Sequence, residues 1–243
     1  MIFNIPFLQN IVNFLLPPQC ALCRETVQKS YTLCASCWLQ LKFITSPKCL
    51  SCSIPLENVD HDMTCIDCLK TPPLFTKAYS PLAYNHAIKK LILQYKNHDA
   101  LHLGPMFLQW IQHHIPENID ILIPVPLHWW RFFIRQYNQA AELGKLIEKQ
   151  KNIPMNTRIL KRIRATSSQG HKSKILRYQN LEKAFTVTDK KHLLKNANVL
   201  LIDDVLTSGA TANACAKSLI EAGAKKVEVL TIARATKGHD GTA

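Results

Sequence analysis

The sequence is poor in acidic residues, and it has neither a long apolar run nor a secretory signal. Its 17 Asp and Glu stand against 30 Lys and Arg. The resulting formal charge of +13 favours an anionic partner such as a nucleotide, a pyrophosphate or a nucleic acid. Because a transmembrane helix needs about 20 consecutive apolar residues, the chain is not expected to cross a membrane. Its 243 residues suit one medium domain with a small appendage.

The first 18 residues are apolar, but they lack the positive start and the small-residue cleavage site of a secretory signal. Gln9, Asn10 and Asn13 fall on one arc of a helical wheel, with apolar residues opposite. Residues 1–18 are therefore predicted to form an amphipathic helix, which Pro17-Pro18 ends. This helix either docks on the chain's own domain or makes a peripheral contact with a membrane.

Eight of the nine cysteines form four C-x-x-C pairs. Each such turn can present two thiolates to one metal ion, and two turns complete a tetrahedral zinc site. The alternative is a disulfide framework, which the missing secretory signal disfavours. We therefore predict a zinc-ribbon domain over residues 19–72 with two structural zinc ions. The predicted ligands are Cys20, Cys23, Cys34, Cys37, Cys49, Cys52, Cys65 and Cys68.

The sequence leaves open which pairs share an ion. Pairing of neighbours along the chain needs only short hairpins and is preferred. The alternative is an interleaved arrangement that joins the first pair to the third. With both ions bound by thiolates the formal charge falls to about +9, so the protein stays basic.

After Thr71-Pro72-Pro73 the pattern changes to apolar strands that alternate with amphipathic helices. This alternation predicts an α/β domain over residues 73–243, built on an open, mainly parallel sheet with helices on both faces. Ligand sites in such folds lie at the carboxyl ends of the strands. The predicted strands are 77–84, 119–125, 199–202 and 227–233, and the predicted helices are one on residues 88–95 and others near 100–114, 138–150 and 211–222.

The stretch VLLIDDVLTSGATA, residues 199–212, carries the most specific signal. Asp203 and Asp204 follow a buried strand, where two adjacent carboxylates can hold a sugar diol or Mg²⁺. The Thr207–Thr211 loop leads into a helix, whose free N–H groups favour a phosphate. Gly209 lets the backbone approach closely. The loop has no lysine, so it is not a Walker A loop.

This stretch resembles the PRPP-binding signature of type I phosphoribosyltransferases. The resemblance implies that Asp203 and Asp204, as catalytic residues, hold the ribose hydroxyls with Mg²⁺ bound alongside PRPP. It also implies that the loop holds the 5-phosphate through Thr207, Ser208, Gly209, Ala210 and Thr211.

The whole chain resembles the ComF (ComFC) competence family. The shared motifs are L-L-P-P-x-C-x-x-C (15–23), P-V-P-L-H (124–128), R-x-Y-N-Q-A (135–140), R-x-R-x-T-x-x-Q (162–169) and R-x-x-N-L-x-x-A-F (177–185). One departure is Gln136, which stands where the family usually has glycine. Any tight turn there has to accommodate a side chain.

Residues 149–181 contain no acid but many basic residues. Such a stretch either is a solvated charged face or binds the phosphates of a nucleic-acid backbone. The resemblance implies a third interpretation, a hood and flexible loop (about 153–195) that closes over PRPP. A pyrophosphate leaving group needs cations and Mg²⁺ where its charge develops. The candidates to contact it are Arg131, Arg135, Arg164, Thr166, Gln169 and Arg177.

The resemblance implies a cytoplasmic role in natural transformation, on incoming single-stranded DNA and with other competence or DNA-processing proteins, at or near the inner face of the cytoplasmic membrane. Two mechanisms fit: a phosphoribosyltransferase that displaces pyrophosphate from PRPP, or a binding module that kept the PRPP site. An active enzyme of nucleotide salvage with no DNA role is the alternative function. The fold alone does not choose between them.

Overall fold

The structure is a computed structural model that describes residues 17–57, 63–96, 98–128, 130, 133, 135–163, 184–189 and 192–236. The predicted N-terminal helix, apart from Pro17 and Pro18, lies outside these residues. Across the described ranges, no helix combines the length and the hydropathy that a membrane span requires.

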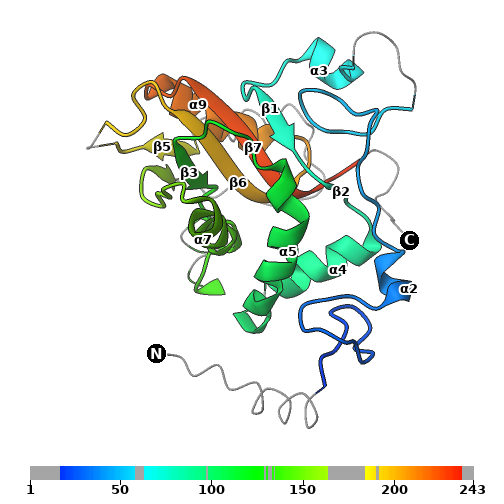
Figure 1. The fold of residues 1–243 in the computed structure, drawn as a ribbon. Helices are drawn as coiled ribbons and strands as arrows, with labels where there is room; N and C mark the ends of the chain where they lie inside the picture. Colours follow the sequence, from blue (N-terminus) through cyan, green and yellow to red (C-terminus); the bar gives the residue numbers. More distant parts are fainter. Residues whose placement is uncertain are drawn as a thin grey trace.

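Within the described chain, five strands form one parallel sheet in the order β1-β7-β6-β3, with β2 also paired to β7 (Figure 1). Because the strands run parallel, their carboxyl ends meet at one edge, as the sequence predicted. The strands are β1 (Lys77–Tyr79), β2 (Leu82–Ala83), β3 (Ile121–Pro124), β6 (Asn198–Leu206) and β7 (Lys226–Arg234).

Helices cover both faces of the sheet, because successive apolar residues of β6 point to opposite sides. Leu200 and Ile202 share one core with helices α4, α5 and α7, whereas Val199 and Leu201 share the other core with α9. This arrangement confirms the predicted α/β fold class. The helices are α4 (His86–Tyr95), α5 (Gly104–Ile111), α7 (Gln139–Lys151) and α9 (Ala210–Glu221).

Three predicted elements have different bounds in the structure. The strand predicted at 77–84 is two short strands, β1 and β2, with Pro81, which has no N–H to donate, between them. The helix predicted at 100–114 is α5 flanked by two 3-10 segments, His98–Leu103 and Gln112–His114. The strand predicted to end at Ile202 continues to Leu206, because β7 pairs with it along its length.

The region assigned to the hood contains a short antiparallel pair, β4 (Leu160–Arg162) and β5 (Phe185–Val187). The sequence did not predict these strands. Residues 164–183, between them, lie outside the described residues.

The cysteine-rich segment contributes two short helices, α2 (Ala35–Trp38) and α3 (Ile66–Lys70), which each begin directly after a cysteine. We call the segment from Cys20 to Cys37, which contains α2, the first ribbon and the segment from Cys49 to Lys70, which contains α3, the second ribbon. The first ribbon packs beside α4, where Lys90 Nζ donates a hydrogen bond to the carbonyl of Leu22 at 2.8 Å (Figure 1). The second ribbon lies beside β1, where the backbone N–H of Ala78 donates to the carbonyl of Ser51 at 2.8 Å. The ribbons are therefore packed against the α/β domain at two different places.

Candidate functional site

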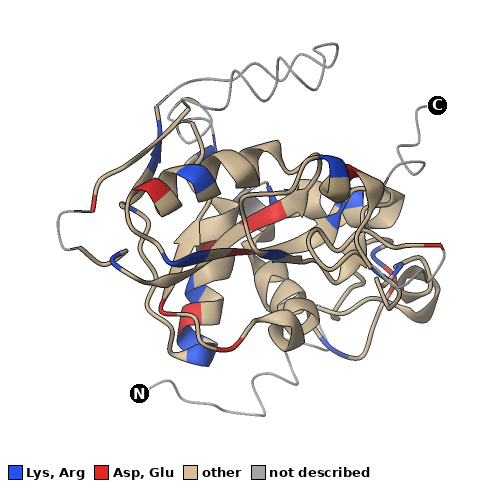
Figure 2. Ribbon diagram, turned by 90° about the horizontal axis from the view of Figure 1, so that it is seen from above, with Lys and Arg blue, Asp and Glu red and all other residues tan. Residues whose placement is uncertain are grey.

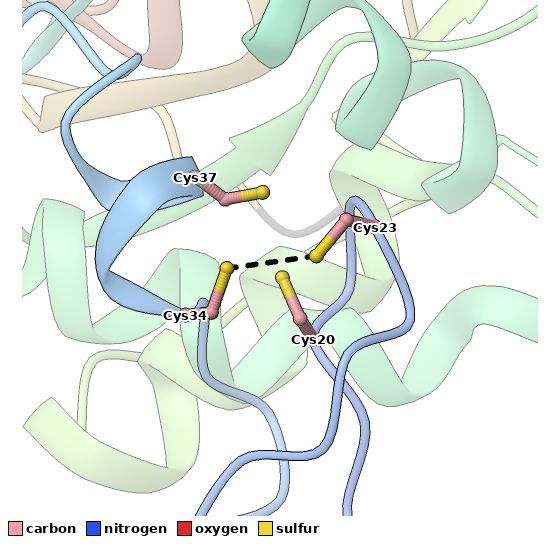
Figure 3. A group of neighbouring side chains, drawn as sticks. All are labelled: Cys20, Cys23, Cys34 and Cys37. Atoms are coloured by element: carbon pink, nitrogen blue, oxygen red, sulfur yellow. Dashed lines mark hydrogen bonds between the residues drawn. The ribbon is translucent and has the colours of Figure 1, made fainter.

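The eight paired cysteines gather into two clusters of four, formed by the first two and by the last two C-x-x-C pairs. This is the sequential pairing that the sequence favoured. In each cluster all four sulfur atoms lie within 4.8 Å of one another, and Figure 3 shows those of the first cluster turned toward a common centre. The clusters are Cys20, Cys23, Cys34 and Cys37, and Cys49, Cys52, Cys65 and Cys68.

The sulfur separations fit zinc. Four sulfurs at about 2.3 Å from a tetrahedral zinc ion are about 3.8 Å apart. The Sγ atoms of Cys23 and Cys34 are 3.5 Å apart, and those of Cys52 and Cys65 are 3.7 Å apart. A full set of four sulfurs leaves no open coordination position, so each cluster suits a structural zinc ion.

The thiols of one cluster do not ionise alike. Hydrogen bonding from the thiol of Cys52 lowers the pKa of Cys49 to about 4, while the same contact, with burial, raises the pKa of Cys52. In the first cluster, burial opposes ionisation of Cys20, but backbone hydrogen bonds to its sulfur prevail and lower its pKa to about 6. The thiols of Cys20 and Cys49 therefore ionise more readily than that of Cys52, from which zinc has to displace a proton.

The acid pair lies inside β6 and not beyond its end. Asp203 pairs in register with Thr231 of β7, and the strand continues for two residues past Asp204. Lys96, at the end of α4, forms an ion pair with Asp204 through Nζ and Oδ2 at 2.6 Å.

The carboxyl group of Asp203 is buried and lies beside a second acid. Burial, and then the negative charge of Asp204, raise the pKa of Asp203 to about 7. A hydrogen bond from the backbone N–H of Asp204 to Asp203 Oδ1, 2.9 Å long, and the charges of Lys96 and Arg162 oppose this rise in pKa. A proton on Asp203 and the ammonium group of Lys96 beside Asp204 therefore offset the negative charge of the acid pair. A diol or a divalent cation can take the place of these two partners.

The loop after β6 is shorter than the predicted Thr207–Thr211 loop, because α9 begins at Ala210. Gly209 adopts φ +78°, a left-handed conformation that favours glycine, and directly precedes α9. Thr207 and Ser208 are exposed, and Ser208 Oγ accepts from the N–H of Ala210 at 3.4 Å. Thr211 lies in the first turn of α9, so the hydroxyls and the start of the helix are grouped within a few residues.

A cavity of about 1110 Å³ opens between the carboxyl end of β3, the start of α7 and β4. Lys161 and Arg162 of β4 line one part of it, and Gln136 and Tyr137 another. Because the charge of Arg162 also lowers the pKa of Asp203, this cavity lies within electrostatic reach of the acid pair.

Gln136 adopts φ +60°, in the left-handed region that a glycine enters without cost. The turn at the R-x-Y-N-Q-A motif thus retains the conformation that suits the family's usual glycine. Asn138 follows it and stabilises the junction, since its Nδ2 donates to the carbonyl of Val125 at 2.9 Å and its Oδ1 caps α7.

Of the predicted pyrophosphate contacts, the structure describes only Arg135, which is partly buried beside Gln136. The roles given to the acid pair and the loop stay predictions. The remaining candidates, Arg131, Arg164, Thr166, Gln169 and Arg177, lie outside the described residues.

Sequence reasoning missed two basic residues that contact the site, Lys96 beside Asp204 and Arg234 beside the loop. Of these two, only Arg234 carried a signal in the sequence, because it is an arginine at the end of an apolar strand.

Two protein families match successive parts of the chain. Residues 11–69 match the double zinc ribbon domain, and residues 106–241 match the phosphoribosyl transferase domain. The second match covers more than half of the chain and includes both the acid pair and the loop.

Curated relatives align with nearly the whole chain. Competence protein F of Haemophilus influenzae is 30% identical over 94% of this chain and 100% of its own length. The DNA utilization protein YhgH of Salmonella typhimurium is 27% identical over 90% of this chain and 98% of its own. Competence protein ComFC of Bacillus subtilis is 27% identical over 83% of this chain and 84% of its own.

Proposed function

This chain belongs to the competence protein F family, with a double zinc ribbon domain joined to a phosphoribosyl transferase domain, and on that premise we propose how it acts. It serves natural transformation as a cytoplasmic protein that binds PRPP, or a related phosphoribosyl ligand, and handles incoming single-stranded DNA. The names of the relatives, competence protein and DNA utilization protein, support the role in natural transformation. The basic stretch and the PRPP signature support the binding of single-stranded DNA and PRPP.

One observation carries the proposal. Asp203 and Asp204 stand at the carboxyl edge of a parallel sheet, and a left-handed Gly209 turns the chain from them into the first turn of α9. The carboxylates can accept hydrogen bonds from vicinal hydroxyls, while the N–H groups and hydroxyls of the loop can donate to a phosphate. A ribose 5-phosphate presents both groups.

The residues around the acid pair prepare it for such a ligand. Lys96 neutralises Asp204 at 2.6 Å, and the proton on Asp203 removes part of the repulsion between the two acids. When the ligand binds, the hydroxyls replace these partners. Mg²⁺ suits the oxygen donors of the pair and the phosphates of PRPP, and it would supply charge neutralisation for the pyrophosphate.

The test replaces both acids, Asp203→Ala with Asp204→Ala. Two charge-assisted hydrogen bonds to ribose contribute about 3–6 kcal/mol, so the double variant should lose about two to four orders of magnitude in PRPP affinity. Calorimetric titration of PRPP with Mg²⁺ measures this loss. The control is Glu117→Gln, which changes an exposed acid on the loop before β3.

The fold should survive the double substitution, since apolar neighbours hold β6 in the sheet. Thermal melts of the unliganded proteins check this point. A double variant that melts normally and binds PRPP within about threefold of wild type would show that the acids do not hold the ribose.

An active phosphoribosyltransferase, in nucleotide salvage and without a DNA role, is the alternative. The cavity beside β4 favours it, because about 1110 Å³ is large enough for an acceptor base. Pyrophosphate release from PRPP and Mg²⁺ separates the two functions. Release stimulated by nucleobases favours the salvage enzyme, release stimulated by single-stranded DNA favours an enzyme of DNA handling, and binding without release favours a sensor or anchor.

A further inference from the structure

Arg234, at the carboxyl end of β7, joins the second cysteine cluster to the loop after β6. Its side chain is buried, with 9% of the residue exposed. Nε donates to the carbonyl of Cys52 at 2.9 Å, and Nη1 donates to the carbonyls of Leu206, at 2.9 Å, and Thr207. One guanidinium therefore holds a zinc-ribbon turn and the first residues of the proposed phosphate loop together.

The planar geometry of arginine makes this connection rigid. A guanidinium offers five N–H donors in a fixed fork, so acceptors bound to different nitrogens are held in a fixed relation. Nη2 of Arg234 also lies 3.7 Å from Cys52 Sγ, one of the zinc ligands. A zinc ion bound by four thiolates carries a net negative charge, which suits a buried guanidinium at this position.

The second ribbon also forms a wall of a cavity over the loop. This cavity, of about 450 Å³, is lined by Cys68 and Lys70 from the ribbon and by the loop residues Thr207, Ser208 and Gly209. Beyond the ribbon, the N–H of Leu74 donates to Asn213 Oδ1 in α9 at 2.8 Å. The second ribbon therefore borders the cavity over the loop, and the chain directly after the ribbon is hydrogen-bonded to α9, the helix that follows the loop.

The first cluster occupies a different place. Its cysteines Cys20 and Cys37 belong to the core that contains α4 and α5. The cysteines that line the cavity over the loop are Cys52 and Cys68, both of the second cluster. The two zinc sites therefore stand in different relations to the loop.

We propose that Arg234 is a positioning residue through which zinc in the second cluster fixes the Thr207–Gly209 loop. The order of the loop then depends on the second zinc ion and not on the first. The link to ligand affinity rests on the proposed function, in which this loop binds the 5-phosphate. A loop that is already ordered binds a phosphate more tightly, because binding then costs less conformational entropy.

The test compares three variants of the full chain. Cys68→Ser disrupts the second cluster without removing a direct contact of Arg234, and Cys23→Ser is the matched change in the first cluster. Arg234→Lys keeps the charge but loses the fork. Elemental analysis gives the zinc content of each, hydrogen exchange of the peptide over residues 205–214 gives the order of the loop, and calorimetry gives the affinity for PRPP with Mg²⁺.

Cys68→Ser should bind one zinc ion fewer than wild type, and its loop amides should exchange at least about tenfold faster. Arg234→Lys should show the same faster exchange while it keeps the zinc content of wild type. PRPP affinity should fall about tenfold or more in both variants, as expected for the loss of hydrogen bonds from a charged donor. Cys23→Ser should lose one zinc ion but leave loop exchange and affinity within about threefold of wild type.

Unchanged loop exchange in Cys68→Ser and Arg234→Lys would overturn the proposal, and so would equal loosening of the loop in Cys23→Ser. If wild type fails to bind PRPP, the proposed function is wrong, while the exchange data still decide whether zinc orders the loop. If loop exchange is faster in Cys68→Ser and Arg234→Lys but their PRPP affinity equals that of wild type, the claim that the ordered loop strengthens ligand binding is wrong.

Discussion

At the scale of single residues, the two acids of β6 have a cost in the unliganded protein. Burial and the charge of Asp204 raise the pKa of Asp203 to about 7. Between the ordinary pKa of an aspartate, near 4, and this value, the unfolded chain loses a proton that the folded chain keeps. The free energy of unfolding therefore falls as the pH rises from about 4 to about 7, and above that range the full cost of the buried charge remains.

Asp203→Asn should remove this cost. We expect the unliganded variant to be about 1–3 kcal/mol more stable than wild type at pH 8, because a neutral amide needs no proton, and about equal to it at pH 4. Urea denaturation at both pH values measures the difference. Glu117→Gln, on an exposed acid, is the control. An equal stabilisation at both pH values would show that the acid pair is not the cause.

Gln136 also has a conformational cost, because the fold holds its backbone in the left-handed region. It holds φ +60°, which costs about 1–2 kcal/mol for a residue with a Cβ. Gln136→Gly should therefore stabilise the protein by about 0.5–1 kcal/mol, after the greater freedom of glycine in the unfolded chain is subtracted. The denaturation midpoint measures it, with Gln136→Ala as the control that keeps the cost. A glycine variant no more stable than the alanine variant would contradict the expectation.

At the scale of elements, each zinc-ribbon cluster is a closed unit of two C-x-x-C turns. The second turn of each begins a short helix, α2 after Cys34 and α3 after Cys65, which fixes the direction of its two sulfurs. Sequence spacing favoured this sequential pairing over an interleaved one without deciding between them, since ligand pairs close in sequence need only a hairpin to meet. The part that spacing could not give was the contact of each cluster with a different part of the α/β domain.

We expect two tightly bound zinc ions per chain, because two complete sets of four sulfurs at zinc separation are present. Cys20→Ser should reduce this to one and unfold the first ribbon, while the parallel sheet stays formed, since its strands pair with one another and one of its two cores contains no residue of that ribbon. Elemental analysis of freshly purified protein counts the ions, and circular dichroism follows the sheet. One ion or none in wild type would contradict the prediction.

The strand that carries the acids shows where sequence reasoning stopped. The apolar run Val199–Ile202 predicted a strand, but a run of hydrophobic residues cannot show that the strand continues through polar ones. Pairing with β7 carries it on to Leu206. Arg234 is then the direct neighbour of Leu206 in the sheet, which explains how it reaches the loop. Such a contact depends on register between strands distant in sequence, so no local pattern reveals it.

At the scale of the whole molecule, the sequence predicted the fold class and favoured the sequential cysteine clusters, but it placed the acid pair beyond the end of a strand, whereas the pair lies inside β6. The motifs for the loop were local, so they could be read directly. The ion pair between Lys96 and Asp204 could not be predicted from the sequence, because it joins the end of α4 to β6, about a hundred residues later in the chain. The same holds for charge: composition gives its sum, and only the fold gives its distribution.

Lys and Arg lie on several elements of the described chain (Figure 2). Single-stranded DNA, if it binds, should therefore meet several basic residues along an extended path. Each neutralised phosphate releases a counterion, so affinity falls with salt with a slope of about −0.7 per contact. For about five contacts this amounts to a loss of about a hundredfold between about 50 and about 200 mM salt.

The variant that tests this path is Lys149→Gln with Lys151→Gln, at the exposed end of α7 in the basic stretch. It should weaken binding at low salt and make the salt slope shallower by about one to two contacts, because it removes phosphate partners. Lys29→Gln with Lys225→Gln removes the same charge from exposed positions outside that stretch and should leave the slope unchanged. Fluorescence anisotropy with a labelled oligonucleotide, across a salt series, measures both. Binding that does not respond to salt, or an equal effect of the two variants, would assign the basic stretch to the PRPP hood and not to DNA.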